Sequence, residues 1–163
     1  MTDDRPSRVA RGPKPPRTVK AQAVVHLSRR EYSRSELRSR LLRGDVTAEA
    51  VDAALDELAA AGLLSDARFA DAVVRQKSGS YSRRAIGATL KAKGVTGDEA
   101  AGALAGHEID DADAIVALWR RRFGTAPAND REKARQVRFL QSRGFALSAI
   151  FRLLRNPPAA EDE

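Results

Sequence analysis

Three glycines recur at intervals of 50 residues, and this period restricts the chain to few architectures. Gly44, Gly94 and Gly144 each close a short stretch that contains leucine and Arg or Lys. A fixed period of this size is typical of repeat proteins, in which each unit buries its apolar face against a neighbour. We therefore predict a tandem array that binds an extended partner.

The composition supports three helical units. At 163 residues the chain holds three units of the size that the period sets, each too small to be secure alone, so we expect a continuous shared core. Aromatic residues make up 5% of the chain and Cys is absent, which favours helices and excludes disulfides, thiolate zinc sites and Cys nucleophiles. No apolar run approaches the roughly 20 residues of a membrane span, so a cytoplasmic protein is expected.

Capping residues divide the chain into helices. Ser33 with Glu36 and Thr96 with Glu99 have the spacing of capping boxes. Nine helices are predicted, over 18–30, 33–44, 48–61, 65–79, 83–93, 96–106, 110–123, 131–143 and 147–155. The predicted fold is all-α: three tandem three-helix repeats that form an elongated, curved, solenoid-like array. The predicted divisions are a disordered, basic, Pro-rich tail (1–17), three repeats (18–64, 65–109 and 110–156) and an acidic tip (157–163).

Charge alternates along the chain in step with these helices. The segments 29–43, 75–93 and 120–143 are rich in Arg and Lys, whereas 45–66 and 98–113 each carry six acidic residues and no Arg or Lys. The formal net charge is +7, which favours an anionic partner such as nucleic acid, although genomic codon bias would also enrich Arg.

If the units stack, the basic middle helices form a stripe along one side. Its predicted members, which we assign to binding, are Arg34, Arg38, Arg83, Arg84, Lys91, Lys93, Arg135, Arg138 and Arg143. Such a stripe would neutralise phosphates or an acidic protein surface. The alternative is that basic and acidic helices pair with each other across the units; exposed pairs are weak, about 0.2–1 kcal/mol each, and scarcely require this segregation.

The sequence offers little chemistry. The segment 107–111 begins with His107-Glu108 but lacks the second His of a zinc-protease motif, and no nucleotide-binding or nucleophile motif occurs. We predict no enzyme, no metal and no cofactor. Trp119 lies at core spacing, whereas the role of Tyr81, core packing or stacking on a nucleic-acid base, stays open.

Several short motifs, in this order and spacing, resemble the RecX regulators. They are Gly62-Leu63-Leu64-Ser65-Asp66-Ala67-Arg68-Phe69-Ala70 at the first repeat junction, Ser35-Glu36-Leu37 in the first repeat, Ser82-Arg83-Arg84-Ala85-Ile86 in the second and Arg138-Phe139-Leu140-Gln141-Ser142-Arg143-Gly144-Phe145 in the third. The resemblance covers about 18–156. One departure is Ala146, which stands where Thr47 and Thr96 begin the equivalent helices.

The resemblance implies a negative regulator of the RecA recombinase. Such a protein binds the groove of the RecA–single-stranded DNA filament and suppresses ATPase, strand exchange and co-protease activity. The expected partners are this filament and single-stranded DNA, with double-stranded DNA as a further candidate, and the protein is expected to act as a monomer. Two alternatives remain: a sequence-independent DNA-binding protein that acts without a recombinase, and a helical adaptor whose acidic helices bind a basic partner.

Overall fold

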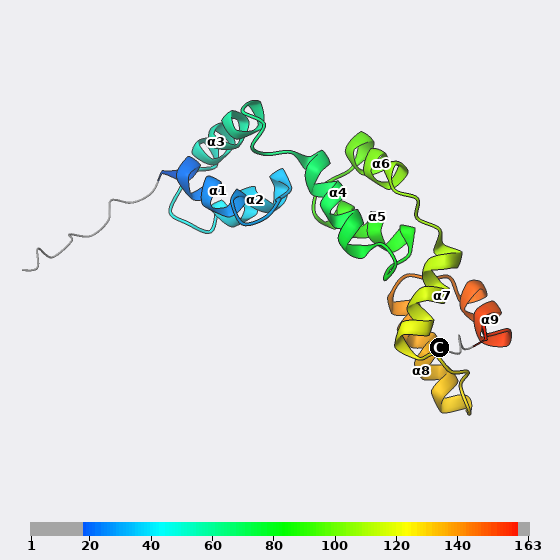
Figure 1. Cartoon of the computed structure of the whole chain (residues 1–163). Helices are drawn as coiled ribbons and strands as arrows, with labels where there is room; N and C mark the ends of the chain where they lie inside the picture. Colours follow the sequence, from blue (N-terminus) through cyan, green and yellow to red (C-terminus); the bar gives the residue numbers. More distant parts are fainter. Residues whose placement is uncertain (1–17, 160–163) are drawn as a thin grey trace, which may run out of the picture.

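The chain is described by a computed structural model that places residues 18–159. Within this range it is all-helical and forms three units of three helices that follow one another along a bent line (Figure 1). The first unit contains α1 (Val19–Leu27), α2 (Arg34–Leu41) and α3 (Ala48–Ala60). The second contains α4 (Asp66–Lys77), α5 (Arg83–Ala92) and α6 (Gly97–Gly106), and the third contains α7 (Asp111–Arg122), α8 (Asp130–Ser142) and α9 (Leu147–Arg155). The predicted fold class is confirmed; the predicted tail lies outside the described residues.

Side-chain caps set most of the helix starts. Ser33, Thr47, Ser65 and Ser82 each accept a hydrogen bond from the backbone N–H three residues later, as their extended backbone and hydroxyl groups allow. Two predicted starts are wrong in detail. The side chain of Thr96 makes no capping bond, and α8 begins at Asp130, capped by Asn129, one residue before the predicted start at 131.

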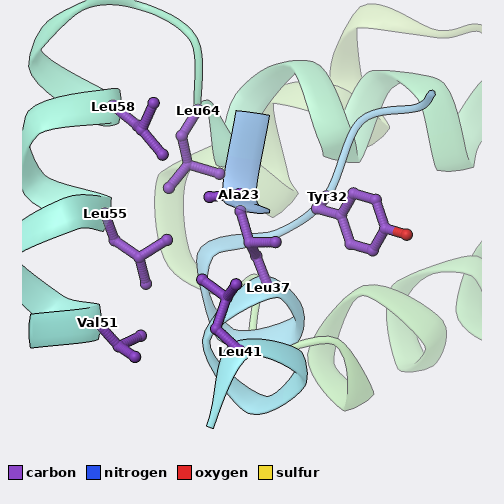
Figure 2. Packing of buried hydrophobic residues seen from close by; sticks show 8 residues of the cluster. All are labelled: Ala23, Tyr32, Leu37, Leu41, Val51, Leu55, Leu58 and Leu64. Carbon is purple, nitrogen blue, oxygen red and sulfur yellow. The ribbon is translucent and has the colours of Figure 1, made fainter. Parts of the chain in front are cut away.

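Each unit has its own hydrophobic core. In the first unit, Leu37 and Leu41 of α2 meet Leu55 and Leu58 of α3, with Ala23 of α1 beside them (Figure 2). The buried residues of the second and third units form two further separate clusters, and extensive helix packing occurs only within units. The expectation of one continuous core is therefore wrong, because polar contacts join the units instead.

The third core contains a buried polar pair. The indole N–H of Trp119, which is 1% exposed, donates to Oε1 of Gln136 at 2.8 Å, and Nε2 of Gln136 donates to the carbonyl of Thr125 at 3.2 Å. Trp119 therefore belongs to the core, as its spacing predicts. Of the residues that the structure describes, none forms a helix long and apolar enough to cross a membrane.

Candidate functional site

The middle helices of the first two units meet end to end. The hydroxyl of Ser33, the N-cap of α2, donates to the carbonyl of Lys93 at the end of α5, at 2.6 Å. Beside it, the N–H of Arg34 donates to Oδ1 of Asp66 at 2.7 Å. The first turn of α2 is thus fixed against the second unit by one hydroxyl and one carboxylate.

The second junction uses the same residue types. The hydroxyl of Ser82, the N-cap of α5, donates to the carbonyl of Gly144 at 2.8 Å, and the N–H of Arg83 donates to Oδ1 of Asp111 at 2.8 Å. The N–H of Ser82 also donates to the carbonyl of Arg143 at 3.0 Å. The N-terminus of α5 therefore lies at the C-terminal end of α8, as the N-terminus of α2 lies at that of α5, so the helix dipoles align favourably along the row.

Two of the three periodic glycines lie at these junctions. A Cβ atom at Gly94 would lie 2.5 Å from Cβ of Ser35, and one at Gly144 would lie 2.5 Å from Cβ of Ala85. Both glycines have φ near +80°, at 77° and 89°. Gly44 differs, because a Cβ there would meet only the carbonyl of Leu41 in its own helix, at 3.4 Å.

The predicted stripe residues of the first unit are engaged in ion pairs. Arg34 lies 2.7 Å from Asp56, and Arg38 lies 2.7 Å from Asp52, both within the unit. The hydrogen bond from Arg38 lowers the pKa of the Asp52 carboxyl and outweighs desolvation. Basic and acidic helices thus pair here within one unit, between α2 and α3, whereas the alternative predicted from the sequence is pairing across units.

Lys93 belongs to an ion cluster at the first junction. Its ammonium lies 3.0 Å from Oε1 of Glu36. The guanidinium of Arg30 donates one hydrogen bond to each carboxylate oxygen of Glu36. Burial alone would raise the pKa of Glu36, but the hydrogen bonds from Arg30 and Lys93 outweigh it and lower that pKa. This cluster ties the first unit to the second.

The stripe residues of the second and third units are different. Arg83, Lys91, Arg135 and Arg138 are exposed and form no ion pair with a described carboxylate. Arg84 donates to the carbonyl of Gly144 at 3.3 Å, again without a carboxylate. These cations remain available to an anionic partner.

Ring contacts hold a further group of cations. Arg143 lies 4.8 Å from the ring centroid of Tyr81 and 5.0 Å from that of Phe139. Arg122 lies 5.6 Å from the ring of Phe139, and Lys77 lies 4.2 Å from the ring of Tyr81. The structure therefore brings Tyr81, whose role the sequence leaves open, against two cations.

Sequence reasoning missed several basic residues near the stripe. Arg40 and Arg43 line an open groove with Ser35, Ser39 and Lys93 at the first junction. The same arginine-rich environment acts on His26: burial and then the charges of neighbouring arginines lower the pKa of that imidazole. The sequence signal for Arg40 and Arg43 was their position in the basic segment 29–43. Only the three-dimensional structure shows that Arg40 lines the groove, whereas Arg38 pairs with Asp52.

The described residues carry little that suggests catalysis. Nε2 of His107 lies 3.5 Å from Oδ1 of Asp71 on α4, so the segment that begins like a zinc motif faces a neighbouring helix. Within residues 18–159, no group of three His, Asp or Glu side chains is arranged to hold a metal ion.

Comparison with known proteins accounts for all three units. Models of the first, second and third three-helix domains of RecX match residues 20–58, 65–104 and 108–154. The chain belongs to the RecX family. It is 39% identical to regulatory protein RecX of Ralstonia pickettii (strain 12J) over 143 residues, 87% of this chain and 89% of that protein. To regulatory protein RecX of Chromobacterium violaceum it is 41% identical over 138 residues, 85% of this chain and 90% of the relative.

Solved structures of RecX share the fold. The crystal structure of RecX from Lactobacillus salivarius aligns with a TM-score of 0.63 at 19% identity, covering 84% of this chain and 92% of that one. A second crystal structure of regulatory protein RecX aligns with a TM-score of 0.65 at 20% identity, covering 85% of this chain and 71% of the other. At this identity the structures support the arrangement of helices.

Proposed function

We propose that this RecX-family protein binds the RecA–single-stranded DNA filament and suppresses its ATPase, strand exchange and co-protease activity. The family supports regulation of RecA as the biological role. The groove of the filament as the binding place, and the basic residues of the middle helices as the contacts, are our own assignment. An elongated row of three units suits a partner that is itself long and helical.

The distribution of ion pairs carries this proposal. Among Lys and Arg pairs whose two partners lie in residues 18–159, every one includes a residue of the first unit. Apart from Lys93, the predicted stripe members of the second and third units form no ion pair with a described carboxylate. They lie on α5, on α8 or at the end of α8, and the junction fixes these two helices in line. Uncompensated charge at fixed spacing favours a periodic polyanion or an acidic protein surface.

The test is the single-stranded-DNA-dependent ATPase of RecA from the same organism, titrated with this protein. The decisive variant is Arg83→Glu/Lys91→Glu, because both side chains are exposed and neither forms an ion pair with a described carboxylate. Arg152→Glu/Arg155→Glu on α9 is the matched control, since it changes the net charge equally on a helix outside the stripe.

We expect the intact protein to inhibit at well below one molecule per RecA protomer. The α5 variant should lose at least tenfold in inhibitory potency, whereas the α9 control should stay within about twofold of the intact protein. Equal loss in both variants would show that only net charge matters. DNA binding without any inhibition would instead support the alternative, a DNA-binding protein that acts without a recombinase.

A further inference from the structure

Cations and aromatic rings alternate across the boundary between the second and third units. Lys77 and Tyr81 belong to the second unit, and the other members belong to the third. The series, which we call the cation–ring ladder, runs Lys77, Tyr81, Arg143, Phe139, Arg122, Phe123 and Arg135, with each cation 4.2 to 5.8 Å from the centroid of a neighbouring ring. Phe123 and Phe139 also meet edge to face, with centroids 5.4 Å apart.

From this ladder we propose a binding site for single-stranded nucleic acid, whose bases stack on the rings while the cations contact its phosphates. The proposal rests on the proposed function only in taking the DNA of the filament as the natural ligand. Stacking on a ring does not depend on base identity, because every base has a π-face, so the site would be sequence-tolerant.

The rings are accessible and firmly held. Tyr81, Phe123 and Phe139 are each half-buried: each packs against the core of its own unit and leaves part of its surface outside. The N–H of Ser82 donates to the carbonyl of Arg143, and Arg121 donates to the carbonyl of Gly79 at 3.3 Å and the hydroxyl of Ser80 at 3.1 Å. The junction thus fixes the ring of the second unit relative to those of the third.

The ladder cations lack carboxylate partners. No described Asp or Glu lies within ion-pair distance of Lys77, Arg122, Arg135 or Arg143. The first unit gives an internal comparison: Arg30 lies 3.5 Å from the ring centroid of Tyr32 but is ion-paired with Glu36. The two sites differ in charge compensation, and only the ladder retains net positive charge beside its rings.

An exchange of contacts explains how such a site would bind. The interaction free energy of a cation with an exposed ring is smaller than that of a base stacked on the same ring. An arginine in water interacts more strongly with a phosphate than with a ring. A strand can therefore take the ring surface while the arginines turn to its backbone. A duplex cannot do this, because its bases are already paired and stacked, and an acidic peptide would use the cations but not the rings.

The experiment measures binding by fluorescence anisotropy, without RecA, to a labelled oligo(dT) of about 15 nucleotides and to an abasic strand of the same length. The ring variant is Tyr81→Leu/Phe139→Leu, and the matched control is Phe151→Leu, an exposed ring outside the ladder on α9. We expect the intact protein to bind oligo(dT) at least tenfold more tightly than the abasic strand.

The ring variant should lose most of this difference and keep its affinity for the abasic strand, while Phe151→Leu changes neither. Arg122→Gln/Arg143→Gln should weaken both strands and reduce the salt slope of binding by about two. Equal affinity of the intact protein for the two strands would overturn the proposal, as would no binding to oligo(dT) at low salt or a ring variant indistinguishable from the intact protein.

A second measurement covers the case in which the ring variant misfolds. In Tyr81→Trp, stacking of a base on the new indole should quench its fluorescence when oligo(dT) is added, whereas the native Trp119 is buried and contributes a constant background. The absence of quenching at saturating oligo(dT) would overturn the proposal. Because RecA is not in the assay, either result leaves the ATPase test of the proposed function independent.

Discussion

Replacing Gly144 by Ala should break the junction between the second and third units. The added methyl group would lie 2.5 Å from Cβ of Ala85 and 2.6 Å from the hydroxyl of Ser82, the group that donates to the carbonyl of Gly144. Both neighbours belong to α5 or its cap, so the methyl group and the N-terminus of α5 cannot occupy their present positions together. The substitution therefore acts on the contact between units more than on either core.

The expected decrease in the free energy of unfolding has two parts, one from the local backbone conformation and one from crowding at the junction. Ala at a positive φ costs about 1–2 kcal/mol wherever it occurs. Gly62 has a φ of 72° and no atom within 4 Å of its Cβ position, so Gly62→Ala measures this local part alone. Crowding at the junction adds about 1–3 kcal/mol, which brings Gly144→Ala to about 2–5 kcal/mol.

Amide hydrogen exchange measures the opening of the junction between the second and third units. The N–H of Ser82 is protected by the carbonyl of Arg143 in the next unit, so its exchange reports separation of the two units. We expect its protection to fall by at least tenfold in Gly144→Ala and to stay within about threefold of the intact protein in Gly62→Ala. Gly44→Ala, which meets only the carbonyl of Leu41, should change nothing at this amide. Equal protection of Ser82 in all three variants would refute the reasoning.

Three further results are expected. Gln136→Ala should lower the free energy of unfolding by about 1–3 kcal/mol, because it leaves the buried Trp119 N–H without its acceptor; urea denaturation measures this, and an unchanged midpoint would contradict that role. Ala146→Thr should raise the free energy of unfolding by about 0.5–2 kcal/mol, because it supplies the missing cap of α9. Thr96→Ala removes no capping bond and should change the free energy of unfolding little. A larger change for Thr96→Ala than for Ala146→Thr in thermal melts would count against this account. The free energy of unfolding should also fall as the pH drops below 6.5, because the pKa of His26 is lowered in the folded state and the unfolded chain therefore binds more protons than the folded one. His26→Gln should flatten this part of the pH profile of stability, and a profile identical to that of the intact protein would rule the contribution out.

Much of the helical structure was predictable because its determinants are local. A Ser or Thr side chain reaches the N–H three residues along, so Ser33, Thr47 and Ser82 mark helix starts without knowledge of the fold. The error at Asn129 is of the same local kind, since Asn and Asp cap equally well and adjacent positions compete. The period of the glycines likewise predicts the number of units.

The junctions were not predictable, because their partners lie far apart in the sequence. Ser33 and the carbonyl of Lys93 are separated by 60 positions, and a sequence shows only that Ser33 caps its own helix. The hydroxyl serves both purposes, accepting from the N–H of Glu36 and donating to Lys93. The same limit applies to charge: the basic segments are visible in the sequence, but whether Arg38 is paired, as it is with Asp52, depends on how α2 faces α3.

The polar junctions also explain how three units with separate cores are held in a fixed arrangement. Hydrogen bonds from Ser33 and Ser82 are directional, so each fixes the angle between neighbouring units, whereas a shared apolar core would tolerate repacking. Since both junctions use a Ser hydroxyl, an Asp carboxylate and a Gly, a similar step is repeated along the chain, and the bent row in Figure 1 follows. In the first unit, Arg34 and Arg38 pair with carboxylates of α3, and Glu31 and Glu36 pair with Arg68 and Lys93 of the second unit. The stripe members that lack a described carboxylate partner and the half-buried rings of the ladder therefore lie on the second and third units, which is where contact with an anionic strand should be strongest.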